Sequence, residues 1–201
     1  MDKNSINNTL DLIAKILDNQ DYTNLEKAIL ILLYFYDDKI DVYRLHKMVF
    51  LASLDFPELR EELEPKPSIY KDIFYDENIA EAIESLKFDG LIEGDTSLQL
   101  SPKGKEEALR FLLSDKEKDI YEEIIDLFKD TTDDEILAIF YYKLYDQIKI
   151  LKPLKRIENN RKKLALSLYQ KGKISIEAAS EIAGMNIKDF MEMLEKKKLL
   201  S

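Results

Sequence analysis

The sequence predicts a mainly α-helical protein: a winged helix-turn-helix domain with a small two-stranded wing, long connecting helices and a C-terminal tri-helical helix-turn-helix. Three observations lead to this prediction. Gly and Pro are scarce, with five of each in 201 residues, which favours helices over long loops. Hydrophobic residues make up 45% of the chain and recur mostly at helical spacing. One short hairpin pattern interrupts the helices at residues 91–100.

The chain begins with three predicted helices. Apolar residues at helical spacing indicate a short helix over residues 6–18. The capping box Thr23-x-x-Glu26 then opens a strongly apolar helix that runs to about Tyr36. Asp41 is placed to cap the helix that follows.

A further helix and the hairpin complete the predicted winged fold. Prolines bracket a short irregular stretch over residues 57–67, after which Asp76 caps a helix that stops at Gly90. Residues 91–93 and 98–100 have the pattern of two short strands joined by a turn, and a Ser-Pro pair then starts another helix. Helices followed by a hairpin and one more helix are the order of a winged helix-turn-helix.

The second half is predicted to be helical. Residues 105–129 keep a helical pattern with a break near Ser114. A second capping box, Thr132-x-x-Glu135, opens a long helix that ends or kinks at Pro153.

The tail is predicted to form a compact unit of three helices. The first spans residues 159–171, Ser175 caps the second, Gly184 makes a turn, and the third runs from about Asn186. Small residues in the second helix before a turn glycine permit the close packing of a helix-turn-helix. The apolar positions of the third helix that we expect to face inward are Ile187, Phe190, Met191 and Leu194.

Charge is distributed unevenly along the chain. Residues 1–142 hold 16 Lys/Arg and 33 Asp/Glu, a net charge of −17, whereas residues 143–201 hold 14 and 7, a net charge of +7. Because the composition turns basic near residues 150–158, we predict an acidic winged-helix domain with a helical extension over residues 1–150 and a basic helix-turn-helix domain over residues 151–201. The simpler alternative is that Lys and Arg only solvate helix faces.

Several classes of protein are disfavoured by what the sequence lacks. The chain has no Cys and one histidine, His46, so cysteine chemistry, His-based triads and His/Cys metal sites have little basis. It also has no phosphate-binding or dinucleotide-binding glycine motif. We therefore predict no enzyme and no cofactor or metal. The longest apolar run, residues 28–36, is far shorter than the roughly 20 residues that span a membrane, so a cytoplasmic protein is expected.

Basic residues before and within the first tail helix could hold a phosphate backbone. With two polar residues at the start of the third helix, they form the predicted DNA-binding set: Arg156, Arg161, Lys162, Lys163, Lys171, Lys173, Asn186 and Lys188. Acids on the third helix (Asp189, Glu192 and Glu195) oppose this prediction, because that helix would enter the major groove. The candidate recognition helix of the winged half is acidic too, so we expect that half to contact protein. Its acids are Asp76, Glu77, Glu81 and Glu84.

The first half resembles the SocA-like (Panacea) domain. Three segments carry this resemblance: residues 44–52, with their Leu-x-Lys-apolar helix, residues 83–92, which end in Asp-Gly-Leu-Ile, and residues 98–104, Leu-Gln-Leu-Ser-Pro-Lys-Gly. The similarity covers roughly residues 24–145. It implies a winged-helix protein of antitoxin type that acts through protein contacts, DNA contacts or both, without catalysis.

The tail resembles a second family. Residues 164–185, with Leu-Tyr-Gln-Lys-Gly-Lys-Ile-Ser followed by Ala-Ala-Ser-Glu-Ile-Ala-Gly-Met, are similar to short prokaryotic, largely archaeal, helix-turn-helix proteins that are uncharacterised and often proposed as antitoxins. This resemblance also implies a regulatory protein without catalysis.

Two functions follow from these features. In the first, the protein is an antitoxin-like or transcriptional regulator of a toxin–antitoxin system, whose acidic half binds a partner protein such as a toxin with a basic surface, while its basic tail binds DNA. A homodimer is expected if the DNA site is palindromic. In the alternative, the protein is a non-catalytic adaptor that binds protein and no DNA. The DNA-binding function requires the basic residues to form one exposed face. The adaptor function is favoured if these residues are scattered or pair with acids.

Overall fold

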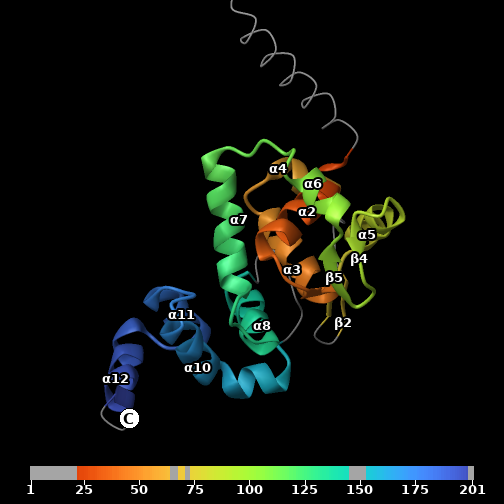
Figure 1. Cartoon of the computed structure of the whole chain (residues 1–201). Helices are drawn as coiled ribbons and strands as arrows, with labels where there is room; N and C mark the ends of the chain where they lie inside the picture. Colours follow the sequence, from red (N-terminus) through yellow and green to blue (C-terminus); the bar gives the residue numbers. More distant parts are fainter. Residues whose placement is uncertain (1–21, 64–67, 71–72, 145–152, 199–201) are drawn as a thin grey trace, which may run out of the picture. The chain divides into compact units, whose positions relative to one another are not determined.

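The computed structural model describes residues 22–63, 68–70, 73–144 and 153–198. Within these ranges the protein is mainly helical and has a small three-stranded antiparallel sheet (Figure 1). The predicted helix over residues 6–18 lies outside the described part of the chain. None of the described helices is long and apolar enough to cross a membrane.

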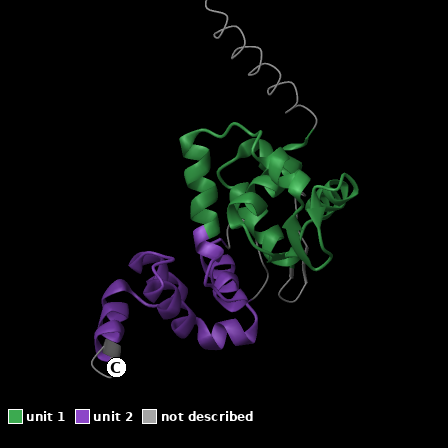
Figure 2. Ribbon diagram, viewed as in Figure 1, with its two compact units in different colours: residues 1–65, 74–125 green, residues 66–73, 126–201 purple. Residues whose placement is uncertain are grey.

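The chain divides into two compact units (Figure 2). The first unit comprises residues 1–65 and 74–125, and the second comprises residues 66–73 and 126–201. The predicted domain boundary near residue 150 falls in the range 145–152, outside the described residues, so it stays a prediction.

Helix α2 (Asn24–Tyr36) forms the centre of the first unit, because it is buried on nearly all sides. The predicted capping box is confirmed: the Glu26 N–H donates to Thr23 Oγ1 at 3.1 Å, and the Thr23 N–H donates to the Glu26 carboxylate at 2.9 Å. Around α2 pack helices whose bounds are α3 (Val42–Ala52), α4 (Pro57–Glu62), α5 (Glu77–Phe88) and α6 (Pro102–Ala108). The stretch after Pro57, predicted to be irregular, therefore includes one short helix, which Pro57 begins.

The sheet of the first unit has the strand order β1-β5-β4. The predicted hairpin is confirmed as β4 (Ile92–Glu93) and β5 (Ser97–Leu100), and a strand not foreseen, β1 (Ile40–Asp41), pairs antiparallel with β5. Gly94 is required in the turn, because at its φ of 99° an added Cβ would lie 2.0 Å from the Ser97 carbonyl oxygen. Strands β2 (Ser68–Tyr70) and β3 (Ile73–Tyr75) form a separate two-stranded sheet.

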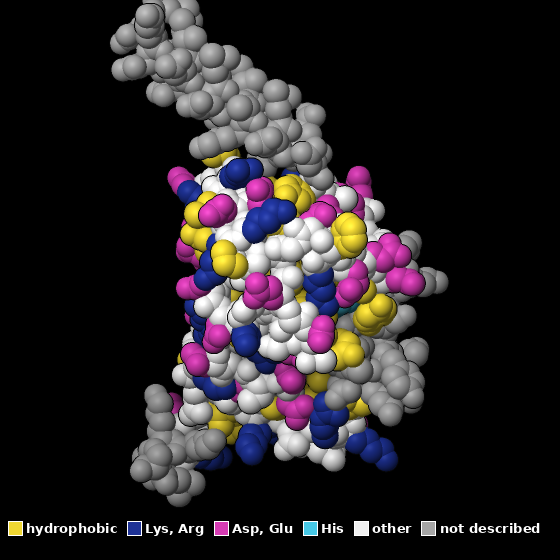
Figure 3. Space-filling model, turned by 45° about the vertical axis from the view of Figure 1, so that its right-hand side comes forward, with side chains coloured by type: hydrophobic (Ala, Val, Ile, Leu, Met, Phe, Trp, Pro, Cys, Tyr) yellow, Lys and Arg dark blue, Asp and Glu magenta, His cyan; other side chains and the backbone are white. Residues whose placement is uncertain are grey.

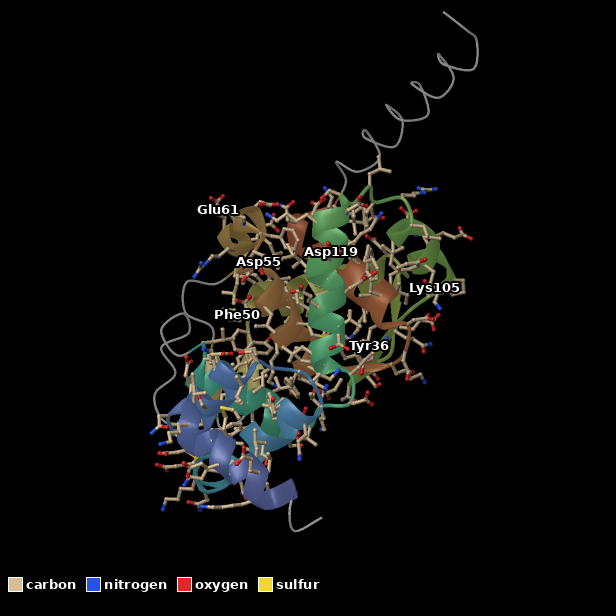
Figure 4. The ribbon with its side chains drawn as sticks, turned by 90° about the vertical axis from the view of Figure 1, so that its left-hand side faces the viewer. Tyr36, Phe50, Asp55, Glu61, Lys105 and Asp119 are labelled. Atoms are coloured by element: carbon tan, nitrogen blue, oxygen red, sulfur yellow. The ribbon has the colours of Figure 1, made fainter. Side chains whose placement is uncertain are left out.

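Helix α7 (Asp115–Phe128) begins in the first unit. It starts directly after Ser114, where the sequence predicted a break between helices. Tyr121 on this helix stacks on the Phe56 ring, with ring centroids 5.2 Å apart. Figure 4 shows α7 along one side of the first unit, where Asp55, Glu61 and Asp119 are exposed to solvent.

The second unit contains α8 (Asp133–Tyr142), α10 (Lys155–Gln170), α11 (Ile176–Ala183) and α12 (Ile187–Lys198). Helix α10 packs against both α8 and α11. Two predicted bounds need correction. Helix α8 ends at Tyr142 rather than near Pro153, and α10 begins at Lys155 rather than at residue 159. The glycine turn after α11 is confirmed, with Gly184 at a φ of 67°.

Candidate nucleic-acid interface and protein-contact faces

The predicted DNA-binding residues fall into two groups in the second unit. Four of them are held by contacts inside that unit, and these are Arg156, Arg161, Lys171 and Lys173. Among the described residues the remaining three cations make no such contact, and these are Lys162, Lys163 and Lys188; Asn186 is exposed and bonds only to its neighbour Asp189. The difference between the groups depends on what each cation contacts.

Arg156 lies in the first turn of α10 and contacts the first turn of α8. Its Nε donates a hydrogen bond to Asp134 Oδ1 at 2.9 Å, and both side chains are partly exposed. An exposed ion pair contributes little to stability, about 0–1 kcal/mol. The ion pair matters here because it gives the guanidinium an anionic partner within the chain.

Lys171, at the end of α10, binds a buried carboxylate. Its Nζ donates to both Glu135 oxygens, at 2.9 and 2.8 Å, and to the Asp130 carbonyl at 2.7 Å. The Glu135 side chain is only 3% exposed. Burial raises the pKa of Glu135, but hydrogen bonds from Lys171, Ser167 and Thr132 outweigh burial and hold that pKa below its ordinary value. Lys171 therefore neutralises a buried charge.

Lys173, in the turn after α10, is nearly enclosed. Its Nζ donates to Asp126 Oδ1 at 3.0 Å and to the Asp126 carbonyl at 2.7 Å, and its side chain is 8% exposed. A phosphate could reach this ammonium only if Asp126 and the groups around it moved away.

Arg161 closes the C-terminal end of α11. Its guanidinium donates to the carbonyls of Glu181 and Ile182 and lies 4.0 Å from the centre of the Tyr142 ring. A cation over an aromatic face is attracted by the ring's negative π surface. Gly184 makes room for this contact, because an added Cβ would lie 2.8 Å from the guanidinium carbon. Arg161 is thus part of the packing of the helix-turn-helix.

The exposed group leaves three cations open to a ligand. Lys162 and Lys163 are exposed on α10, and Lys188 is exposed on α12. Asn186 caps α12 instead of pointing freely outward: its Oδ1 accepts the Asp189 N–H at 2.9 Å, and its Nδ2 donates to the Asp189 carboxylate at 2.7 Å.

Helix α12 is acidic on its exposed side and less buried than the sequence predicted. Phe190 is fully buried as expected, but Ile187 and Met191 are 43% and 48% exposed, so the prediction that both face inward was wrong. Helix α12 has more apolar positions than α11 can cover, because α11 packs against only one side of α12. The acids Asp189, Glu192 and Glu195 are all exposed.

Helix α5 of the first unit has an exposed face on which acidic side chains are aligned. Glu77, Glu81, Glu84 and Phe88 follow the spacing i, i+4, i+7 and i+11, which places them along one stripe of the helix, and all four are exposed. Phe88 is 92% exposed. Glu84 also accepts a hydrogen bond from Lys87 at 2.8 Å. We call these four residues the acidic stripe. Figure 3, in which the right-hand side of Figure 1 comes forward, shows acidic side chains on the upper right of that face.

The one histidine of the chain is buried and hydrogen-bonded. His46 is 1% exposed, and its Nδ1 accepts the Asp76 N–H at 3.2 Å. Burial, with a smaller contribution from the nearby Lys47, lowers the His46 pKa to about 4. A surface hollow of about 550 Å³ in the second unit is lined partly by Glu135, but a general acid at neutral pH needs a raised carboxyl pKa, and that of Glu135 is lowered. No cluster of three or more potential metal ligands occurs among the described residues.

The C-terminal helices are the part of the chain that resembles known proteins. Residues 142–200 match the model of an Uncharacterised protein family (UPF0175). The match spans α10, α11 and α12, and it supports the similarity of the tail to an uncharacterised family. No curated protein and no solved structure matches the chain. The resemblance of the first half to the SocA-like domain stays a prediction.

The acids that partner the basic tail were not foreseen from the sequence. Asp126, Asp134 and Glu135 precede the predicted domain boundary and were counted with the acidic half. The fold places all three in the second unit, against the cations of the tail. The available signal was the Asp-Asp-Glu run in the first turn of α8, which precedes the basic segment.

Proposed function

We propose that this protein is a non-catalytic, antitoxin-like regulator that acts by binding another protein, and that the acidic stripe on α5 is the face that binds. The acidic stripe is the observation that carries the proposal. Three carboxylates on one helix face attract a basic surface, and an aromatic ring at the end of the row supplies an apolar anchor.

The arrangement of the first unit supports a winged helix-turn-helix. Strand β1 lies between α2 and α3 in sequence and pairs with the hairpin strand β5, and α5 precedes the hairpin. In a winged helix-turn-helix, the helix before the wing is the one that enters a DNA major groove. Here that helix is α5, so the acidic stripe occupies the face that would meet DNA phosphates.

Negative charge on this face favours a protein partner over nucleic acid. Phosphates would be repelled by Glu77, Glu81 and Glu84, whereas Lys and Arg on a partner would be attracted. The resemblance to the SocA-like domain implies action through protein contacts, DNA contacts or both, so it admits a protein partner. We propose that the partner is a toxin with a basic surface. The two proteins would meet inside the cell, and no membrane would take part.

Site-specific photo-cross-linking tests this proposal. A photoreactive phenylalanine analogue at position 88 is expected to capture one protein with a basic surface when the full chain is irradiated in its own cells. The same analogue at Leu112, also exposed in the first unit at 57%, is the matched control. Replacing Glu77, Glu81 and Glu84 with Gln should abolish capture at position 88. Equal products from both positions, or capture that persists after the Gln replacements, would refute the role of the acidic stripe.

DNA binding by the second unit is a second candidate. The observation that favours it is the exposure of Lys162, Lys163 and Lys188 on the helix-turn-helix. Three cations could position a phosphate backbone, but sequence would have to be read by base contacts from α12, whose exposed acids oppose approach to the groove. We therefore rank this candidate second.

A further inference from the structure

Helix α12 has an apolar stripe that its own unit does not cover. On one side, Phe190 is fully buried and meets the Tyr169 ring edge-to-face, with centroids 6.1 Å apart. On the other side, Ile187 and Met191 are 43% and 48% exposed, and Leu194 is partly exposed. Their spacing of i, i+4 and i+7 places them on one face of the helix. We call Ile187, Met191 and Leu194 the α12 stripe.

We propose that the α12 stripe is the docking surface for a second copy of this chain, with the two α12 helices antiparallel about a two-fold axis near Met191. In a two-fold contact the same patch serves both copies. An antiparallel pairing centred on Met191 lays one stripe along the other, so Ile187 at one end of each helix lies towards the far end of the other.

The charges beside the stripe fit a second copy in this orientation. Lys188 and Glu195 are seven residues apart, so both lie along the same edge of the α12 stripe, and both are exposed. When two identical helices pair antiparallel, equivalent edges face each other. Lys188 then faces Glu195 of the second copy, and Glu195 faces Lys188 of the second copy. The midpoint between the two positions falls beside Met191.

A parallel pairing would lose this match. In a parallel pair each edge meets the opposite edge of the other helix. The opposite edge of α12 carries Phe190 and Met193, which lie on the side that packs against the rest of the unit. Lys188 and Glu195 would then have no counterpart. The reciprocal charge pattern therefore favours the chain itself, in antiparallel orientation, as the occupant.

Sedimentation equilibrium of the full chain tests the proposal. The wild-type protein is expected to associate to a dimer as its concentration rises, and Met191→Asp is expected to remain a monomer. Leu109→Asp is the matched control, because Leu109 is an exposed leucine (64%) that belongs to the first unit and not to the α12 stripe. It should dimerise like the wild type. Circular dichroism of each variant confirms that helix content is unchanged.

A charge exchange tests the antiparallel geometry. Lys188→Glu and Glu195→Lys should each weaken the dimer roughly tenfold, because each turns two attractive pairs into two repulsive ones. The double variant restores both pairs with their signs exchanged and should return to within about threefold of the wild type. A wild-type chain that stays monomeric, or a dimer indifferent to Met191→Asp, would overturn the proposal. A double variant no better than the single ones would overturn the antiparallel arrangement.

Discussion

Replacing Lys171 with Met is expected to destabilise the second unit by about 3 kcal/mol, because the substitution leaves the Glu135 carboxylate buried without its cation. The two Glu135 oxygens accept from Lys171 Nζ at 2.9 and 2.8 Å, and the Glu135 side chain is 3% exposed. We place the loss at the lower end for a buried pair, since 32% of the Lys171 side chain reaches solvent.

Hydrogen–deuterium exchange of the α8 and α10 amides measures this loss within the second unit. Lys162→Met is the matched control, because Lys162 is exposed on the same helix and should change protection little. Adding Glu135→Gln to the Lys171 variant should recover part of the loss, since a neutral amide is cheaper to bury than an unpaired carboxylate. Equal protection in the Lys171 and Lys162 variants would show that Lys171 is not needed to hold Glu135.

The first unit should lose roughly 3 kcal/mol of stability between pH 7 and pH 4 through His46 alone. Burial lowers the folded-state pKa of His46 to about 4, against 6.5 in an unfolded chain. The unfolded state therefore takes up a proton first as the pH falls. The contribution is fully present above pH 6.5 and is lost progressively as the pH falls towards 4. Protonation of Nδ1 would also remove the acceptor for the Asp76 N–H at the start of α5.

Comparison with His46→Asn isolates this effect from carboxylates that titrate in the same range. Asn places an oxygen near the position of Nδ1 but has no proton to gain. Denaturant unfolding at several pH values should give a wild-type curve that falls more steeply than the Asn curve below pH 6.5. Parallel curves would contradict the assignment of a neutral, buried His46.

Local signals predicted the helices of this protein well. The capping residues Thr23, Asp41, Asp76 and Thr132 each begin a helix at the expected place. Each signal depends on a side chain within three residues of the backbone groups that it caps, so no tertiary information is needed. The hairpin was predictable for the same reason, since a turn and two short strands lie within ten residues.

The features that were missed depend on distant residues. Strand β1 is two residues long and exists because Ile40 pairs with Leu98, a contact that no local pattern announces. The exposure of Ile187 and Met191 depends on how little of α12 its neighbours cover. The same limit applies to the candidate site.

The role of the basic tail could not be deduced from charge along the chain. The contrast between a net charge of −17 in residues 1–142 and +7 in residues 143–201 suggests that the cations of the tail bind an anion from outside the chain. In the folded second unit, Asp126, Asp134 and Glu135 supply anions from within. Net charge by segment therefore overstated the positive surface that the tail offers.

The proposal that these cations serve the fold rather than DNA is tested most directly by fluorescence anisotropy of labelled duplexes, including the region upstream of the gene, across about 50–200 mM salt. Because Arg156, Arg161, Lys171 and Lys173 are engaged within the second unit, Lys162, Lys163 and Lys188 are the predicted cations left to bind phosphate among the described residues, and we expect weak binding without preference between duplexes. The logarithm of affinity should fall with the logarithm of salt concentration by a slope no steeper than about −3. Tight binding to one preferred duplex, with a slope of about −6 or steeper, would contradict the proposal and make this protein a DNA-binding regulator.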